Sequence, residues 1–171
     1  MTAAQNSVSI CDNGVDLEFS FDDMLRYHGP GFPGGVAHAF KVMQRGLTEL
    51  AKTGPVSRRD LRVDTSFGGP GGRDAFELVT RAVTEGRYNV DKSLGEPFWD
   101  GTHRERYFFR FVDGDRMIEM VIRGGHVRDE FIELGAKADK TPEEIERHNY
   151  LKQEMADRLL ALPADEIYDI L

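Results

Sequence analysis

A histidine at the start of a glycine-rich segment is the residue of this chain best placed to do chemistry. Residues 27–35 read YHGPGFPGG, so four glycines and two prolines stand in nine positions around His28. Glycine frees the backbone and proline restricts it, and together they are typical of a shaped loop. We expect the loop to present His28 at the start of the next helix. Free N–H groups and partial positive charge there can hold an anion, a metal ion or a reacting carbonyl. A turn with no chemical role is the alternative.

A second glycine cluster, residues 68–72, follows a strand-like stretch at 61–65 and precedes Arg73 and Asp74. A guanidinium beside a glycine loop can clamp a carboxylate or phosphate, so Arg73 is a candidate substrate ligand, with a solvated surface arginine as the alternative. Asp74 begins the pattern of a capping box over 74–77. Neither glycine cluster has the phosphate-loop or dinucleotide-binding pattern, so we expect no nucleotide or flavin cofactor.

A metal site is the other chemistry that the histidines allow. His28 and His38 stand on the loop and on the following helix, and together with Asp64 or Asp74 they can form an open site for one divalent metal ion, zinc or iron. The alternatives are that His38 is a surface residue of its helix and that His28 caps or packs. The remaining histidines are predicted to be surface residues: His103, His126 and His148.

The elements that must position these residues follow from hydrophobic periodicity and from capping signals. A long amphipathic helix is predicted over 36–53, and a polar irregular segment around Pro97 and Trp99 is expected to loop over a site. The sheet is at least partly antiparallel, because 104–122 has the alternation of a hairpin with its turn at Asp113 and Gly114. Other expected elements are a short helix from about Ser20 to the loop, a strand at 61–65, a helix from Asp74 to Gly86, a short strand at 88–91, and a last helix from Thr141 to about Leu160, broken at Pro163 and followed by an apolar tail.

Composition limits the class of protein. The chain has 171 residues, a formal net charge of -8 and 40% hydrophobic residues, which fits one domain with a core and argues against nucleic-acid binding. Its one cysteine, Cys11, allows neither an internal disulfide nor a multi-cysteine zinc site within the chain. We expect a cytoplasmic protein with no membrane association, a loose segment over 1–18 and a single domain over 19–171.

Three stretches resemble the FmdE-like family, which takes its name from a component of formylmethanofuran dehydrogenase. Residues 28–34, HGPGFPG, stand where that family has His-Gly-His-x-Cys-Pro-Gly, and residues 71–75, GGRDA, stand where it has Cys-Gly-x-Asp-Ala. The resemblance continues through a Thr-rich helix to Asn89 and through a last helix that starts at 141–144. It covers about residues 19–171.

This resemblance implies an α+β fold with a mixed or antiparallel sheet, long helices on one face and a C-terminal helix, like the catalytic domain of glyceraldehyde-3-phosphate dehydrogenase. It also implies a homodimer and a metal site, usually zinc, near the first motif. The chain is a divergent relative in this comparison, because Pro30, Phe32 and Gly71 replace a histidine and two cysteines of the motifs. Only His28 carries over as a site position. A site that lacks the cysteine thiolates of the family favours an oxygen-rich anionic substrate.

The sequence therefore predicts a small-molecule enzyme that performs non-redox acid–base or metal-assisted chemistry on a carboxylate-bearing substrate, of the lyase, decarboxylase or isomerase type. His28 and Arg73 are the predicted catalytic residues. A non-catalytic metal- or ligand-binding accessory protein is the alternative. The residues predicted to bind substrate are Gly34, Gly35, Gly71, Gly72, Asp74 and Asn89.

Overall fold

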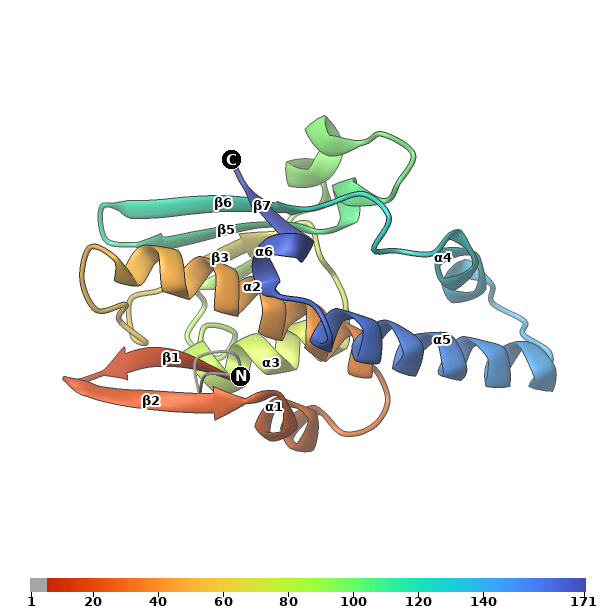
Figure 1. Ribbon diagram of the computed structural model, residues 1–171, viewed down its shortest axis with the longest axis horizontal. Helices are drawn as coiled ribbons and strands as arrows, with labels where there is room; N and C mark the ends of the chain where they lie inside the picture. The colour runs from red at the N-terminus through yellow and green to blue at the C-terminus, as the bar shows by residue number, and fades with distance from the viewer. Residues whose placement is uncertain (1–5) are drawn as a thin grey trace.

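The computed structural model describes residues 6–171, whose helices and strands form the expected α+β fold with mixed strand directions (Figure 1). Two 3-10 helices lie between β4 and β5. The elements are β1 (Ser7–Asp12), β2 (Val15–Ser20), α1 (Phe21–His28), α2 (Pro33–Ala51), β3 (Arg62–Thr65), α3 (Pro70–Thr80), β4 (Tyr88–Val90), the 3-10 helices Lys92–Phe98 and Arg104–Arg106, β5 (Phe108–Asp113), β6 (Arg116–Ile122), α4 (Asp129–Ala136), α5 (Pro142–Leu160), α6 (Ala164–Ile167) and β7 (Tyr168–Ile170).

Five strands form one sheet in the order β4-β3-β5-β6-β7, in which β3 and β4 are parallel and the other neighbours antiparallel. The hairpin predicted over 104–122 is confirmed by β5 and β6, which are joined by a turn where Gly114 has a φ of +60°. Alternation along β5 places Phe111 against α2, while Phe108 stacks on Phe98 with ring centroids 5.4 Å apart. The sheet is therefore covered by α2 on one face and by a 3-10 helix on the other.

Helix α2 is the long helix predicted for 36–53, but it begins earlier, with Pro33 at its first position. Proline suits that position because the first N–H of a helix has no intrahelical partner. The helix runs between the sheet and the β1–β2 hairpin (Figure 1). Gly46 allows a close approach to the sheet, since a Cβ at this position would lie 2.6 Å from the ring of Phe111. As a result, α2 is buried along most of its length.

The prediction of a loose segment over residues 1–18 is wrong for the part that the structure describes, and residues 1–5 lie outside it. Strands β1 and β2 pair in an antiparallel hairpin that turns at Asn13 and Gly14, both with positive φ. Val8 and Ile10 are buried in the core that contains α2. The hairpin is stable because this apolar face packs on a helix, which supplies the burial that two isolated strands lack.

The C-terminal region follows its sequence signals. Helix α5 starts at the predicted capping box, in which the Thr141 Oγ1 accepts the Glu144 N–H at 3.3 Å and a Glu144 carboxylate oxygen accepts the Thr141 N–H at 2.9 Å. After Pro163 the apolar tail forms α6 and β7, and β7 extends the sheet by pairing with β6. Tyr168 in β7 is fully buried, so this tail completes the core beside α2.

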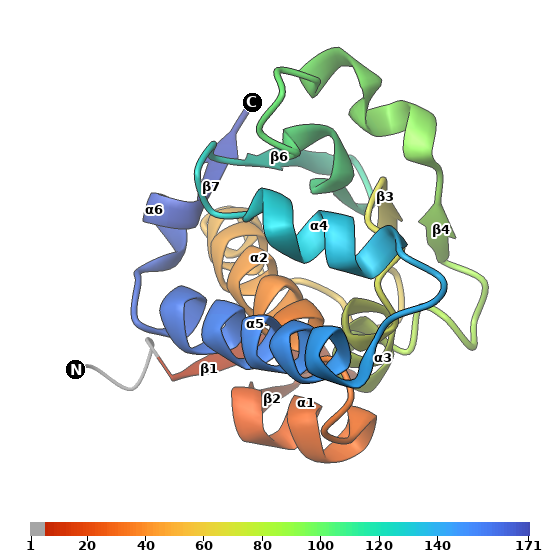
Figure 2. The same cartoon turned by 90° about the vertical axis from the view of Figure 1, so that its right-hand side faces the viewer.

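Helices α4 and α5 extend past the sheet at one end of the molecule, where α4 lies across the end of the fold in front of α2 (Figures 1 and 2). None of the eight residues of α4 is fully buried. Phe131 and Ile132 pack partly buried against the core, and two ion pairs add to this contact, with Arg147 on Glu130 at 2.7 Å and Arg128 on Glu154 at 2.8 Å. Across the described part of the chain, every helix is too short or too polar to cross a membrane.

Candidate functional site

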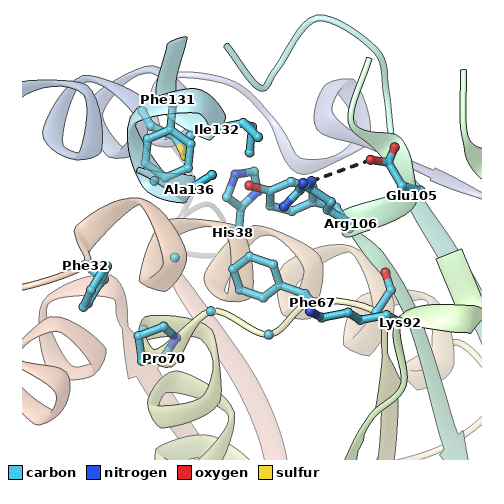
Figure 3. Close-up of a pocket in the computed structure, with 18 of the residues that line it drawn as sticks. Phe32, His38, Phe67, Pro70, Lys92, Glu105, Arg106, Phe131, Ile132 and Ala136 are labelled. Atoms are coloured by element: carbon cyan, nitrogen blue, oxygen red, sulfur yellow. Dashed lines mark ion pairs between the residues drawn. The ribbon is translucent and has the colours of Figure 1, made fainter. Parts of the chain in front are cut away.

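A cavity of about 600 Å³ lies at the end of the fold that α4 covers. Its wall is built by the first turns of α2, the loop from β3 into α3, the two 3-10 helices, α4 and α5 (Figure 3). A volume of this size suits a small organic ligand. The lining residues are Phe32, Gly35, His38, Ser66, Phe67, Gly68, Gly69, Pro70, Gly71, Lys92, Glu105, Arg106, Tyr107, Phe131, Ile132, Gly135, Ala136, His148 and Met155.

His38 lies in the wall of this cavity and belongs to α2. Its residue surface is 0% exposed, and its Nδ1 lies 2.8 Å from the hydroxyl oxygen of Tyr168. The ring is 4.4 Å from that of Tyr107, measured between centroids. Burial lowers the pKa of His38 to about 3, because charge is costly in an apolar surrounding, so the imidazole is neutral at pH 7. The Nε2 atom has no hydrogen-bond partner anywhere in residues 6–171.

The contact with Tyr168 decides which nitrogen of His38 carries the proton. Burial raises the pKa of Tyr168 well above its ordinary value, so the hydroxyl keeps its hydrogen. If this O–H donates to Nδ1, the hydroxyl and Nδ1 are both satisfied, whereas the opposite direction leaves the hydroxyl hydrogen without an acceptor in the core. The proton of His38 is therefore assigned to Nε2. The side chain then offers the cavity an uncharged N–H donor.

The second glycine cluster brings the start of α3 to the same cavity. Gly69 is the N-cap and Pro70 the first residue of the helix, so the first-turn N–H groups lack intrahelical acceptors. A Cβ on Gly71 would lie 2.6 Å from the carbonyl oxygen of Phe32, and one on Gly72 would lie 2.4 Å from the ring of Phe67. Glycine is needed here for close packing around the cavity. The contact of Gly71 with Phe32, and that of Gly35 with Gly72, bring the two glycine clusters together.

Of the six residues predicted to bind substrate, only Gly35 and Gly71 line the cavity. Gly34 and Gly35 are part of α2 and not of a preceding loop. A Cβ on Gly34 would lie 2.9 Å from a sulfur atom of α5, so this glycine serves helix packing. Asn89 is exposed, with its amide nitrogen 3.4 Å from Asp64.

His28 lies outside the lining of the cavity. Its Nδ1 is 2.7 Å from an Asp74 carboxylate oxygen, its side chain is 8% exposed, and its Nε2 is unpartnered within the described chain. The predicted capping role of Asp74 is wrong, because α3 begins at Pro70 and Asp74 points to α1 instead. Arg73 is 59% exposed and lies 3.5 Å from Asp74, also outside the lining. The His28–Asp74 pair fastens α1 to α3 beside the loop that carries Phe32.

The residues present do not fit the zinc or iron site that the family resemblance implies. Within residues 6–171 no group of three or more histidine, cysteine, aspartate and glutamate side chains lies close enough together to hold a metal ion. The Nδ1 of His28 is engaged by Asp74, and Pro30 and Phe32 offer no donor side chain. His38 belongs to the cavity wall whereas His28 does not, so the two predicted ligands serve different parts of the fold.

Sequence reasoning missed three of the polar residues in the lining: Lys92, Arg106 and His148. The first two stand at the ends of the segment that contains Pro97 and Trp99, and neither of these two residues lines the cavity. That this segment loops over a site stays a prediction. His148, predicted on the surface, has its ring 5.3 Å from that of Phe131 and an unpartnered, buried Nε2 atom. Partial burial lowers its pKa, so it too is largely neutral at pH 7.

No protein-family model matches this chain, and no curated protein matches it either. The resemblance to the FmdE-like family stays a prediction from the glycine motifs.

Proposed function

We propose that the protein is a small-molecule enzyme that carries out non-redox acid–base chemistry on a carboxylate-bearing substrate in this cavity, as an isomerase, decarboxylase or related lyase. The observation that carries the proposal is the Nε2 of His38, a fully buried polar atom that has no partner in residues 6–171 and belongs to a side chain that lines a ligand-sized cavity. Buried polar atoms are nearly always hydrogen-bonded, so an orphan in a cavity wall marks a place for a ligand atom.

His38 acts in this proposal as a donor and not as a base. A pKa of about 3 makes the neutral imidazole a poor proton acceptor at pH 7, while its N–H can stabilise negative charge that develops on a substrate carbonyl oxygen. When a proton leaves the carbon next to that carbonyl, the electron pair moves to the oxygen that His38 holds. His148 has the second unpartnered imidazole in the lining and accepts the proton.

The test uses phenylpyruvate, an aromatic 2-oxo acid, in deuterated water. Exchange of its methylene protons, followed by proton NMR, reports the proton-transfer step without requiring the natural substrate. The His38→Leu/Tyr168→Phe double variant removes the donor and its partner together, so no buried hydroxyl is left unpaired. We expect the protein to accelerate exchange over the buffer blank and the double variant to lose about 100-fold of that rate, as loss of an oxyanion donor does.

The matched control is His126→Gln, since His126 lies outside the cavity and bonds the carbonyl oxygen of Glu166 at 3.1 Å. This variant is expected to keep the exchange rate. An unchanged rate in the double variant would sink the assignment of His38.

A ligand-binding accessory protein is the second candidate. It is favoured by the fact that the two predicted catalytic residues, His28 and Arg73, lie outside the cavity. Saturable binding of phenylpyruvate without exchange above the blank is the outcome that selects it.

A further inference from the structure

The cavity is polar on one side and apolar on the other. Figure 3 shows Lys92 and Arg106 on one side, Phe32 and Pro70 on the opposite side, and His38 between them. We propose that the ligand of this cavity is a small aromatic monocarboxylate, with its carboxylate at Lys92 and Arg106 and its ring towards Phe32, Pro70 and Phe131. This inference deepens the proposed function, because it names the substrate class for the same cavity.

The cationic side is unusual for so acidic a chain. The formal net charge is -8, and most arginines outside the cavity are paired with carboxylates at about 3 Å, as Arg147 is with Glu130 at 2.7 Å. Lys92 has no ion pair with any residue of 6–171, and Arg106 has only a 3.6 Å contact with Glu105. Glu105 also lines this side, so two cations stand against one carboxylate and the side keeps a positive charge. Such a side attracts an anion, and a guanidinium suits the two oxygens of a carboxylate.

The apolar part of the wall presents flat surfaces. The rings of Phe67 and Tyr107 are stacked, with centroids 5.0 Å apart and planes at 27°, and both line the cavity. Phe131, on α4, lies above Phe67 in Figure 3. A planar aromatic ring makes better contact with such surfaces than a branched aliphatic group does, and it gains the edge and stacking interactions that aromatic pairs favour.

The uncharged state of His38 favours a ligand with one carboxylate. Its single N–H can receive a carbonyl or carboxylate oxygen at the middle of the cavity, but it brings no charge. A second carboxylate would have to lie against Phe32 and Pro70, which offer no donor side chain. Removing a second anion from water beside these two side chains is unfavourable, so a monocarboxylate is expected to bind more tightly than a dicarboxylate.

The experiment measures fluorine NMR line broadening with four probes: para-fluorobenzoate, its uncharged amide para-fluorobenzamide, the ring-free trifluoroacetate and the dicarboxylate fluoroterephthalate. We expect para-fluorobenzoate to bind at least about tenfold more tightly than each of the others, since it alone satisfies both sides of the cavity.

Arg106→Gln and Arg73→Gln form a matched pair. The two arginines are 55% and 59% exposed, and each lies about equally far from an adjacent carboxylate, at 3.6 Å and 3.5 Å. Arg106→Gln is expected to weaken para-fluorobenzoate binding about fivefold to tenfold and to leave the amide unaffected, while Arg73→Gln changes neither.

Equal binding of the acid and the amide, or equal effects of the two arginine variants, would overturn the inference and leave the proposed function standing if His38-dependent proton exchange is present. Preferred binding of fluoroterephthalate also overturns it. If the parent protein binds para-fluorobenzoate selectively but does not accelerate proton exchange above the buffer blank, the proposed function alone would be overturned.

Discussion

Burial of a neutral histidine makes the stability of the fold depend on pH in a calculable way. His38 has a pKa of about 3 in the folded protein, against an ordinary value of 6.5 in an unfolded chain. The unfolded state therefore takes up a proton first as the pH falls. The contribution of His38 to stability is complete above pH 6.5 and is lost progressively as the pH falls from 6.5 towards 3.

The size of this effect follows from the same two values. One pH unit of differential protonation is worth about 1.4 kcal/mol, so moving from pH 7 to pH 5 lowers the free energy of unfolding by about 2 kcal/mol through His38 alone. This is a large share of the roughly 5–15 kcal/mol that is usual for a folded domain. Other groups with lowered pKa values, including His126 and His148, contribute as well, so a matched variant is needed.

The His38→Leu/Tyr168→Phe double variant isolates the contribution of His38. Urea unfolding at pH 7 and pH 5, followed by circular dichroism, gives the loss of stability for each protein. We expect the parent to lose about 2 kcal/mol more than the double variant, because all other groups that titrate in this range are common to both. Tyr168→Phe alone retains the imidazole and is expected to retain the pH dependence. Equal losses in the parent and the double variant would refute the assignment of a neutral, buried His38.

The remaining predictions concern contacts outside the cavity that stabilise the fold. Gly46→Ala is expected to lower the free energy of unfolding by about 2 kcal/mol, since its Cβ would lie 2.6 Å from the ring of Phe111. Gly31→Ala has no atom within 4 Å of its Cβ and should change stability by less than about 0.5 kcal/mol, as urea unfolding will show. Asp74→Ala should cost about 1–2 kcal/mol by unfastening α1 from α3, yet para-fluorobenzoate binding should stay within about twofold, because Asp74 does not line the cavity. A larger loss of binding in this variant would show that His28 and Asp74 belong to the ligand site.

The parts of the fold that sequence predicts well are those with strong local signals. The alternation over 104–122 and the capping box at Thr141 each fix an element through neighbouring residues. The N-terminal hairpin has such a signal too, since Asn13-Gly14 between alternating residues is typical of a two-residue turn. This turn signal is easily overlooked, because two isolated strands need a packing partner, and the helix on which Val8 and Ile10 pack lies further along the chain.

The candidate site was only partly predictable, because its chemistry depends on distant partners. Helix α2 is enclosed by the sheet, the hairpin and helices α1, α3, α5 and α6. A histidine that helical spacing places off its main apolar face is therefore buried nevertheless. The hydroxyl that bonds His38 comes from Tyr168, 130 positions later. Local patterns also direct attention to Arg73, whereas Arg106 lines the cavity from a 3-10 helix that stands where the pattern predicts the start of a hairpin strand.

The pairing of β7 with β6 links the sheet edge to the protonation state of the cavity. Strand β7 has three residues and pairs with β6 alone, and the buried Tyr168 anchors this edge strand in the core, so the edge opens only when that side chain leaves the core. When this edge frays, the Tyr168 hydroxyl leaves His38, and nothing then holds the imidazole proton on Nε2. Each local opening therefore lets the imidazole exchange between a donor and an acceptor state. The lifetime of the paired edge strand, rather than the cavity itself, would set how long His38 keeps its proton on Nε2.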